Sequence, residues 1–234
     1  MDYNLSPLGD NAIVIEVSNK INLPSQKKVQ AIAALLNEFP PLWMIEYIPA
    51  YTTITIFYKI ESFISLKQSP LEAVSKKVDA LLFNLTSSSE IQANIVKIPV
   101  LYGGEYGPDL QFVADHNNIT IEEVIQIHTS GDYTVHMIGF APGFPFIGGM
   151  STKIAAPRRN TPRLSIPART VGIAGSQTGV YPIETPGGWQ LIGSTPLELF
   201  LPNKDIPSLL KAGDKIQFYQ ITKEEYAGMV GDGL

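Results

Sequence analysis

The stretch Val171-Gly-Ile-Ala-Gly-Ser-Gln-Thr-Gly-Val-Tyr-Pro-Ile-Glu-Thr-Pro-Gly-Gly-Trp189 decides the fold class of the second half of this 234-residue chain. Its short apolar runs are separated by glycine and proline, the residues that most often mark turns between strands. Similar runs recur along this half, at Tyr133–Ile138, Leu164–Ile166, Trp189–Ile192, Leu197–Leu201 and Lys215–Ile221. Short strands at this spacing predict an all-β barrel or sandwich.

Helices are expected on both sides of this β region. A first short helix is predicted near Pro108–Asp115. A second begins at the capping box Thr120–Glu123 and runs to about His128, and Thr222–Glu225 predicts a similar start for a final helix. In a capping box the first side chain and the acidic one three residues later each accept a bond from an unpaired backbone N–H group.

The first 95 residues predict a separate, small α/β domain. Two helices are expected, over Pro24–Phe39 and from the capping box Ser69–Glu72 to Ser87–Ser89. Strands are expected at Ala12–Val17, Trp43–Ile48, Thr52–Tyr58 and Ile91–Val100. The resulting order, βαββαβ, is that of a ferredoxin-like split βαβ fold. We therefore expect an α+β domain over residues 1–95 and a mainly β domain over residues 96–234.

Composition excludes several classes of function. The net charge is −5, and outside one short segment there is no basic stripe of the kind that binds nucleic acid. The chain has no cysteine, which excludes disulfides, thiolate zinc sites and a cysteine nucleophile. The N-terminus lacks the features of a signal peptide, and no apolar run is long enough to span a bilayer. A cytoplasmic protein that binds neither nucleic acid nor membrane is expected.

Every arginine of the chain lies in one short segment, at Arg158, Arg159, Arg163 and Arg169. The guanidinium group binds carboxylate or phosphate through two parallel hydrogen bonds, which a lysine cannot do. The segment therefore predicts a surface that binds anions, with a solvated basic loop as the alternative.

Aromatic and polar residues flank the arginines in sequence. Phe140, Pro142, Gly143 and Phe144 could form the wall of an apolar pocket, or a packed corner of a barrel. Gly187, Gly188 and Trp189 would allow a ligand to approach the backbone closely and stack on an indole. A polar set could contact a small polar ligand or simply form exposed turns: Gln177, Thr178, Tyr181 and Glu184.

No catalytic or metal-binding motif accompanies these residues. Walker A and Gly-x-Ser-x-Gly sequences are absent. His116, His128 and His136 lack the spacing of metal ligands, so each is expected to be structural or on the surface. His128 is expected at a helix end, where a cation would be favourable. The catalytic residues stay unassigned, and no metal site is expected.

Five motifs together resemble the KipI family, which is also called allophanate hydrolase subunit 1 and includes the B subunit of the prokaryotic 5-oxoprolinase. The resemblance covers nearly the whole chain, and the motifs that carry it are Tyr102–Leu110, His128–Ser130, Gly139–Gly149, Pro157–Arg163 and Val171–Trp189. The resemblance implies a small α/β domain followed by a cyclophilin-like barrel of the carboxyltransferase type.

The resemblance also implies a function and partners. With a KipA-like protein (allophanate hydrolase subunit 2) and a LamB/YcsF-like protein, such chains form an ATP-dependent hydrolase that opens 5-oxo-L-proline to L-glutamate. No activity is expected of this chain alone, and it stays open which component of the complex binds ATP. Two alternatives are inhibition of a sporulation sensor histidine kinase and a role in processing urea-derived allophanate.

The family motif assigns substrate-binding residues position by position. Arg159 and Arg169 stand at positions where the family motif is less strict about the residue type. A small residue would be expected at position 169. Those that match the motif in place are Arg158, Arg163, Gln177, Thr178, Tyr181, Gly187, Gly188 and Trp189.

Overall fold

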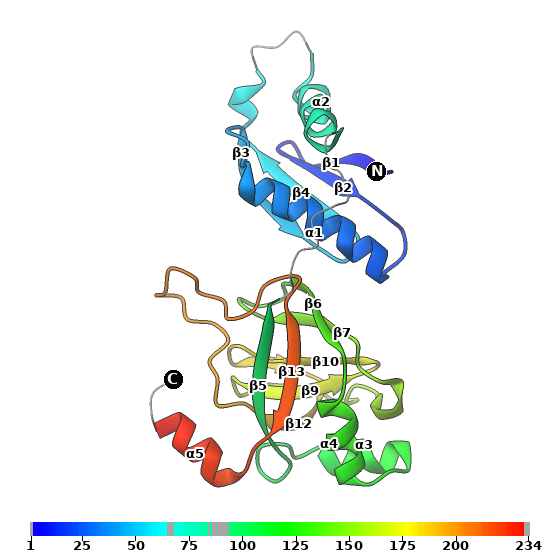
Figure 1. Cartoon of the computed structure of the whole chain (residues 1–234), viewed down its shortest axis with the longest axis vertical. Coiled ribbons are helices and arrows are strands. Elements are labelled where there is room, and N and C mark those ends of the chain that lie inside the picture. The colour runs from blue at the N-terminus through cyan, green and yellow to red at the C-terminus, as the bar shows by residue number, and fades with distance from the viewer. Residues whose placement is uncertain (1, 65–67, 84, 86–93, 232–234) are drawn as a thin grey trace. The chain divides into compact units, whose positions relative to one another are not determined.

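The chain folds into two compact units, residues 1–92 and 93–234 (Figure 1). The computed structural model describes residues 2–64, 68–83, 85 and 94–231. Within the described residues, no helix is long and apolar enough to cross a membrane.

The first unit is an antiparallel sheet packed against two helices. Its strands β1 (Asn4–Leu8), β2 (Ala12–Glu16), β3 (Met44–Pro49) and β4 (Thr53–Tyr58) lie in the order β1-β2-β4-β3. The helices are α1 (Leu23–Glu38) and α2 (Pro70–Phe83), and a 3-10 turn spans Ile60–Ser62. Isoleucines that alternate along β2 and β4 pack with the apolar stripes of both helices to form the core of this unit.

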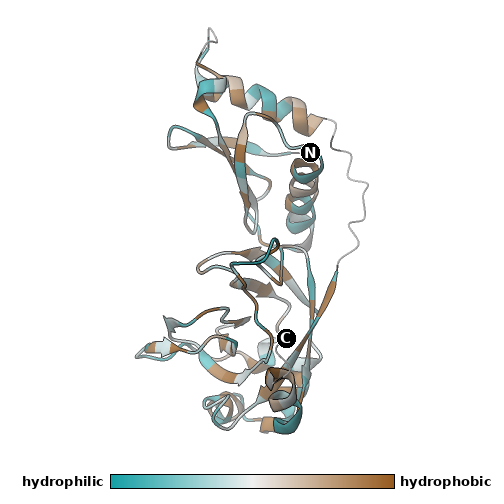
Figure 2. Cartoon of the chain, turned by 90° about the vertical axis from the view of Figure 1, so that its left-hand side faces the viewer, coloured by the Kyte–Doolittle hydropathy of each residue, from teal (hydrophilic) through white to brown (hydrophobic). Residues whose placement is uncertain are grey.

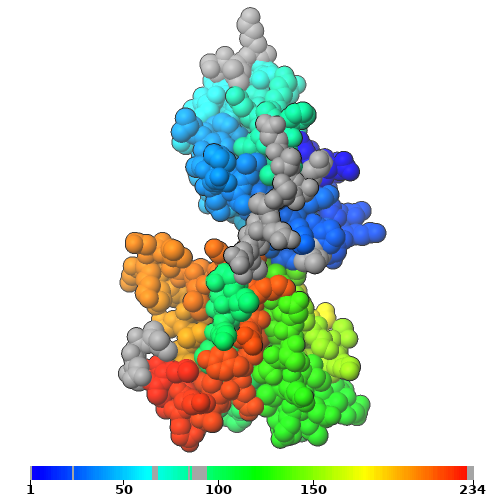
Figure 3. Space-filling view, in the orientation of Figure 1, coloured from blue at the N-terminus to red at the C-terminus, as the bar shows by residue number. Residues whose placement is uncertain are grey.

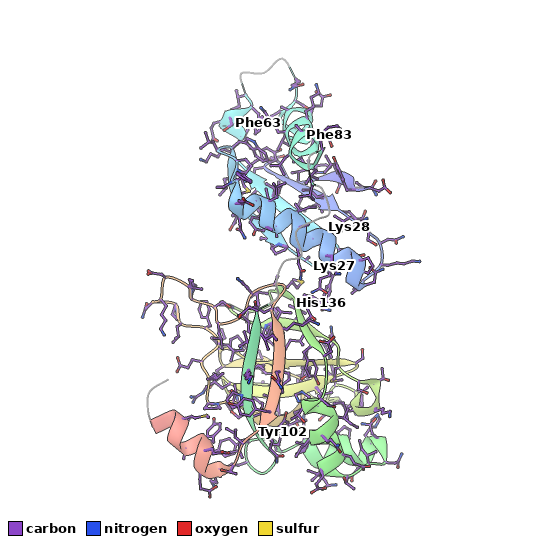
Figure 4. The ribbon with its side chains drawn as sticks, viewed as in Figure 1. Lys27, Lys28, Phe63, Phe83, Tyr102 and His136 are labelled. Atoms are coloured by element: carbon purple, nitrogen blue, oxygen red, sulfur yellow. The ribbon has the colours of Figure 1, made fainter. Side chains whose placement is uncertain are left out.

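Local sequence signals account for the ends of these elements. The predicted capping box at the start of α2 is present, with reciprocal bonds of 3.2 Å between Ser69 and Glu72. Asn22 caps α1 by accepting a bond of 2.9 Å from the backbone of Ser25. Phe63, labelled in Figure 4, is buried beside Tyr58, with ring centroids 5.6 Å apart. The predicted end of α2 at Ser87–Ser89 lies outside the described residues.

The expected order βαββαβ is wrong at both ends. The strand that pairs with the free edge of β2 is β1, which the sequence pattern does not predict. The strand expected at Ile91–Val100 is β5 (Ile95–Tyr102), which belongs to the second unit. Residues 91–93 of that expected strand lie outside the described residues. A three-residue turn joins β1 to β2, with Gly9 at φ 63°. Such a short hairpin forms locally, at a lower entropic cost than recruiting a strand across α2.

The second unit is a closed barrel with the strand order β10-β7-β6-β13-β5-β12-β9. Its other strands are β6 (Tyr133–Ile138), β7 (Pro145–Gly148), β9 (Thr170–Ala174), β10 (Gln177–Val180), β12 (Gln190–Ser194) and β13 (Lys215–Gln220). The pair β5–β13 is parallel and the other neighbouring strands are antiparallel. Alternate residues of the strands point inward and fill the barrel with apolar side chains.

Helices and a small ribbon surround the barrel. Helices α3 (Leu110–Asn117) and α4 (Ile121–Thr129) lie side by side at one end of it (Figure 1). Helix α5 (Lys223–Gly231) lies on the outside, where Figure 3 shows it in red. A 3-10 turn spans Thr152–Ile154, and β8 (Arg163–Ile166) pairs with β11 (Thr185–Gly187) in a two-stranded ribbon. Figure 2 shows that hydrophobic and hydrophilic residues are mixed along the ribbons of both units, as amphipathic elements require.

Several predicted elements are confirmed and others are wrong. The strand predicted at Tyr133–Ile138 is β6, and the capping box Thr120–Glu123 begins α4 with bonds of 2.7 and 3.1 Å. Leu197–Leu201 is not a strand; Phe200 forms one isolated bridge with Ser208. Gln177 and Thr178, for which no strand is predicted, begin β10.

Candidate functional site

An aromatic cluster lies against the outer face of the barrel wall formed by β9, β10 and β12. We call it the outer aromatic cluster; its members are Phe144, Tyr181 and Trp189, packed with Ile166 and Leu191. Val180 and Ile192 point into the barrel. Because neighbouring residues of a strand face opposite sides, Tyr181 and Leu191 point outward.

Two glycines leave the room that the indole of Trp189 occupies. Gly172 of β9 and Gly179 of β10 are directly opposite each other. A β-carbon on Gly179 would lie 3.1 Å from Trp189 Cζ3 and 3.3 Å from Phe144 Cζ, and one on Gly172 would lie 3.3 Å from Trp189 Cβ. The missing side chains therefore leave a flat patch of backbone on which the indole packs.

The three rings of the outer aromatic cluster meet edge to face. The centroid of Phe144 is 5.6 Å from that of Tyr181 and 5.9 Å from that of Trp189, and Tyr181 and Trp189 are 6.2 Å apart. This geometry is favourable for aromatic pairs. Phe144 and Tyr181 are buried, whereas Trp189 is partly exposed.

The ribbon β8–β11 brings the arginine segment to this cluster. Gly187 is opposite Arg163 in the ribbon. A β-carbon on Gly187 would lie 2.7 Å from Tyr181 Oη and 2.8 Å from Ile166 Cδ1, so only glycine lets the ribbon approach so closely. Next to it, the carbonyl of Gly188 accepts a bond of 2.7 Å from the backbone of Arg159.

Asp109, at the start of α3, joins two of the arginines to the barrel. Its Oδ1 accepts from Arg163 Nη2 at 2.8 Å and from Arg159 Nη1 at 3.2 Å. Its Oδ2 accepts from the backbone N–H of Leu191 at 2.7 Å, and its own N–H donates to the Leu191 carbonyl at 2.9 Å. The Asp109 side chain is 8% exposed, so a largely buried carboxylate has its charge compensated by two guanidinium groups.

Arg158 is arranged differently from its two neighbours. Its side chain is exposed, and within the described residues it forms neither an ion pair nor a hydrogen bond. Burial raises the pKa of Tyr181 to about 12, while the charges of Arg158 and Arg163 act in the opposite direction. Arg158 is therefore close enough to the Tyr181 hydroxyl to interact with it electrostatically.

The structure brings together most of the residues predicted from the sequence. Arg158, Arg163, Tyr181, Gly187, Gly188, Trp189 and Phe144 all lie in or beside the outer aromatic cluster. Phe140 is 70% exposed, with its ring 5.3 Å from that of Phe144, and Pro142 is exposed. Gly143, at φ 77°, packs against Phe200.

Two residues of the predicted set lie elsewhere. Gln177 is at the opposite end of β10 from Tyr181, opposite Ala174. Thr178 is 1% exposed, and its hydroxyl donates to the carbonyl of Gly172 at 3.1 Å. The side chain of Thr178 therefore belongs to the barrel interior.

Arg169 adopts a backbone conformation that explains why a small residue is expected there. Its φ is 70°, in the left-handed region where glycine is favoured. Its N–H donates to the Tyr181 carbonyl at 2.5 Å and its carbonyl accepts from the Thr195 N–H at 2.9 Å. These two backbone bonds hold the conformation despite the side chain.

His128 extends from α4 into the barrel, away from the arginines. Its Nε2 is 2.9 Å from Thr178 Oγ1, and its Nδ1 is 2.8 Å from the hydroxyl of Tyr102, which Figure 4 labels. Because the Thr178 proton is donated to Gly172, Nε2 must donate and Nδ1 must accept. Burial lowers the pKa of His128 to about 3, so the ring is neutral and the expectation of a favourable cation here is wrong.

Asp109 is the site residue that sequence reasoning missed. It lies within the motif Tyr102–Leu110, but nothing in that motif shows that it meets arginines 50 and 54 residues away. No group of three or more histidine, aspartate or glutamate side chains that could hold a metal occurs in the described parts of the chain.

Comparisons with known proteins place this chain in a family. The family model described as "Carboxyltransferase domain, subdomain C and D" matches residues 3–210. The B subunit of 5-oxoprolinase from Bacillus subtilis is 52% identical over 228 residues, covering 96% of this chain and 95% of that protein. That of Escherichia coli O157:H7 is 40% identical over 211 residues, covering 90% and 93%.

A solved structure shows the same fold in a larger protein. The urea carboxylase of Kluyveromyces lactis matches with a TM-score of 0.72 and 20% identity, over 98% of this chain and 23% of that one. At this identity the likeness concerns the fold alone.

Proposed function

This chain belongs to the carboxyltransferase domain subdomain C and D family and, within it, to the 5-oxoprolinase B subunits, and we propose that it is an obligate component of an ATP-dependent 5-oxoprolinase. The observation that carries the proposal is the match to the Bacillus subtilis protein along almost the whole of both chains. The complex would convert 5-oxo-L-proline to L-glutamate, together with KipA-like and LamB/YcsF-like proteins.

The reaction requires activation of a stable cyclic amide. Transfer of the γ-phosphoryl group of ATP to the lactam oxygen would make the ring carbon electrophilic. Water would then add to that carbon and the carbon–nitrogen bond would break, which releases the amine and leaves an acyl phosphate, γ-glutamyl phosphate. A second water would hydrolyse this acyl phosphate to L-glutamate and inorganic phosphate. The substrate, the phosphorylated intermediates and the product are all anionic, and positive groups fixed where charge develops are an effective form of catalysis.

The arginines and the outer aromatic cluster suit a ligand of this kind. The guanidinium groups of Arg158 and Arg163 supply positive charge for a carboxylate or phosphate. The Tyr181 hydroxyl can bond to an amide, and Trp189 offers a partly exposed aromatic face for a small ring. Gln177, at the other end of β10, would contact the ligand only if the site extends along that strand.

The proposal is tested by reconstitution. We expect ATP-dependent release of glutamate from 5-oxo-L-proline by the complex of all three proteins, and none when this chain is left out. This chain alone should release no glutamate. Full activity without this chain would show that it is not an obligate component.

A further inference from the structure

The three arginines that accompany the outer aromatic cluster are not equivalent. Arg159 and Arg163 share the single oxygen Oδ1 of Asp109, which compensates part of their charge and fixes their direction. Arg163 also donates to the Trp189 carbonyl at 3.4 Å, so its guanidinium group bonds to the protein on both sides. Bonds to the protein therefore fix the direction of both guanidinium groups.

Arg158 forms no such bonds among the described residues. It is exposed, and among the described residues it pairs with no carboxylate. It lies in the same segment as the two bound arginines and close enough to Tyr181 for its charge to act on that hydroxyl. One uncommitted guanidinium group matches one carboxylate in charge and in geometry, because the pair can form two parallel hydrogen bonds.

The side chain of Asp109 is held in a fixed position by the protein. Its carboxylate is largely buried, and both of its oxygens accept hydrogen bonds from the protein. Without it, the charges of Arg159 and Arg163 would lose the carboxylate that compensates them, and a doubly charged inorganic anion would be bound more tightly. The carboxylate of Asp109 therefore lowers the summed charge of the three arginines, which weakens the attraction for a doubly charged anion more than that for a singly charged one.

We propose that Arg158 binds the carboxylate of a small cyclic amide acid, and that Asp109 is a positioning residue that holds Arg159 and Arg163 and weakens the binding of free inorganic dianions such as sulfate. This inference rests on the proposed function, since 5-oxo-L-proline is a ligand of this class. It assigns binding of the ligand carboxylate to Arg158 alone, whereas the family motif assigns substrate binding to both Arg158 and Arg163.

The test uses the three-protein complex with variants of this chain. Arg158→Gln should raise the KM for 5-oxo-L-proline about tenfold or more, because a charge-assisted pair is lost, while kcat changes little. Arg158→Lys should recover part of the loss, since a point charge replaces the planar group. Lys153→Gln removes another exposed cation of the same unit and should leave the KM unchanged. An Arg158→Gln complex with the KM of the wild type would overturn the assignment.

Asp109 is tested by inhibition with inorganic sulfate. Asp109→Asn keeps an oxygen that can accept from Leu191 but removes the negative charge. We expect sulfate to compete with 5-oxo-L-proline at a concentration about fivefold lower than for the wild type. A residue that only stabilises the fold would change the unfolding temperature and leave sulfate inhibition as it was, which would overturn the role of Asp109. A wild-type complex that releases no glutamate would instead refute the proposed function, and this inference with it.

Discussion

His128 couples the stability of the barrel to pH through one proton. In the unfolded chain its pKa has the ordinary value of 6.5, and burial lowers the pKa in the folded chain to about 3. Between these values the unfolded chain binds a proton that the folded chain does not. The free energy of unfolding should therefore fall as the pH drops from about 6.5 toward 3, by up to about 1.4 kcal/mol per pH unit from this residue.

Urea unfolding at several pH values between 7 and 4.5 measures this slope. His128→Gln should lower the slope, although His136, whose pKa is also lowered by burial, should keep a smaller contribution. His116→Gln, an exposed replacement on α3, controls for the removal of one histidine. If His128→Gln does not fold, the ¹⁵N chemical shifts of the His128 ring in the wild-type protein at pH 5 show whether the ring is neutral in the folded state. A protonated His128 in the folded protein would contradict the prediction.

At the scale of elements, the glycine pair between β9 and β10 determines where Trp189 lies. Gly179→Ala would place a β-carbon 3.1 Å from the indole and 3.3 Å from Phe144. We expect the indole to shift and the barrel to lose about 1–3 kcal/mol of stability, as overpacking does elsewhere. Tryptophan fluorescence in a Trp43→Phe background reports the shift, because only two tryptophans are present.

Gly228→Ala is the matched control. Gly228 lies in α5, where a β-carbon would meet nothing within 4 Å. The same substitution should therefore stabilise the protein by about 0.5–1 kcal/mol through helix propensity, with the emission of Trp189 unchanged. Equal effects of the two substitutions would show that the glycine pair does not position the indole.

The same elements show what the sequence could and could not predict. Local signals are sufficient to predict β6 and the capping box of α4, because apolar runs and helix caps depend only on residues that are close in sequence. β10 was missed because Gln177, Thr178 and Gly179 are typical of turns; here Thr178 bonds to His128 and Gly179 makes room for Trp189. Asp109 was missed for a related reason, since its arginine partners are more than 49 residues away in sequence. Contacts of this kind depend on the closed barrel and cannot be derived from spacing.

At the scale of the whole molecule, each unit has a hydrophobic core of its own. The buried residues of the first core lie between Ile13 and Leu82, and those of the second unit lie between Ile98 and Phe218. The barrel closes when β5 pairs with β13, and both strands belong to the second unit. Closure leaves the barrel no unpaired edge strand that the first unit would have to cover. Neither core thus needs residues of the other unit.

We therefore expect residues 93–234 to fold when they are produced without the first unit. The fragment should show the near-ultraviolet circular dichroism of packed aromatic residues. Its urea transition should coincide with that of the full chain carrying Trp43→Phe, in which Trp189 alone reports on the barrel. The pH dependence caused by His128 should also be retained, because its partners Tyr102 and Thr178 are in the fragment. A fragment without fixed aromatic packing, or one with a much lower urea midpoint, would show that the barrel depends on the first unit for its stability.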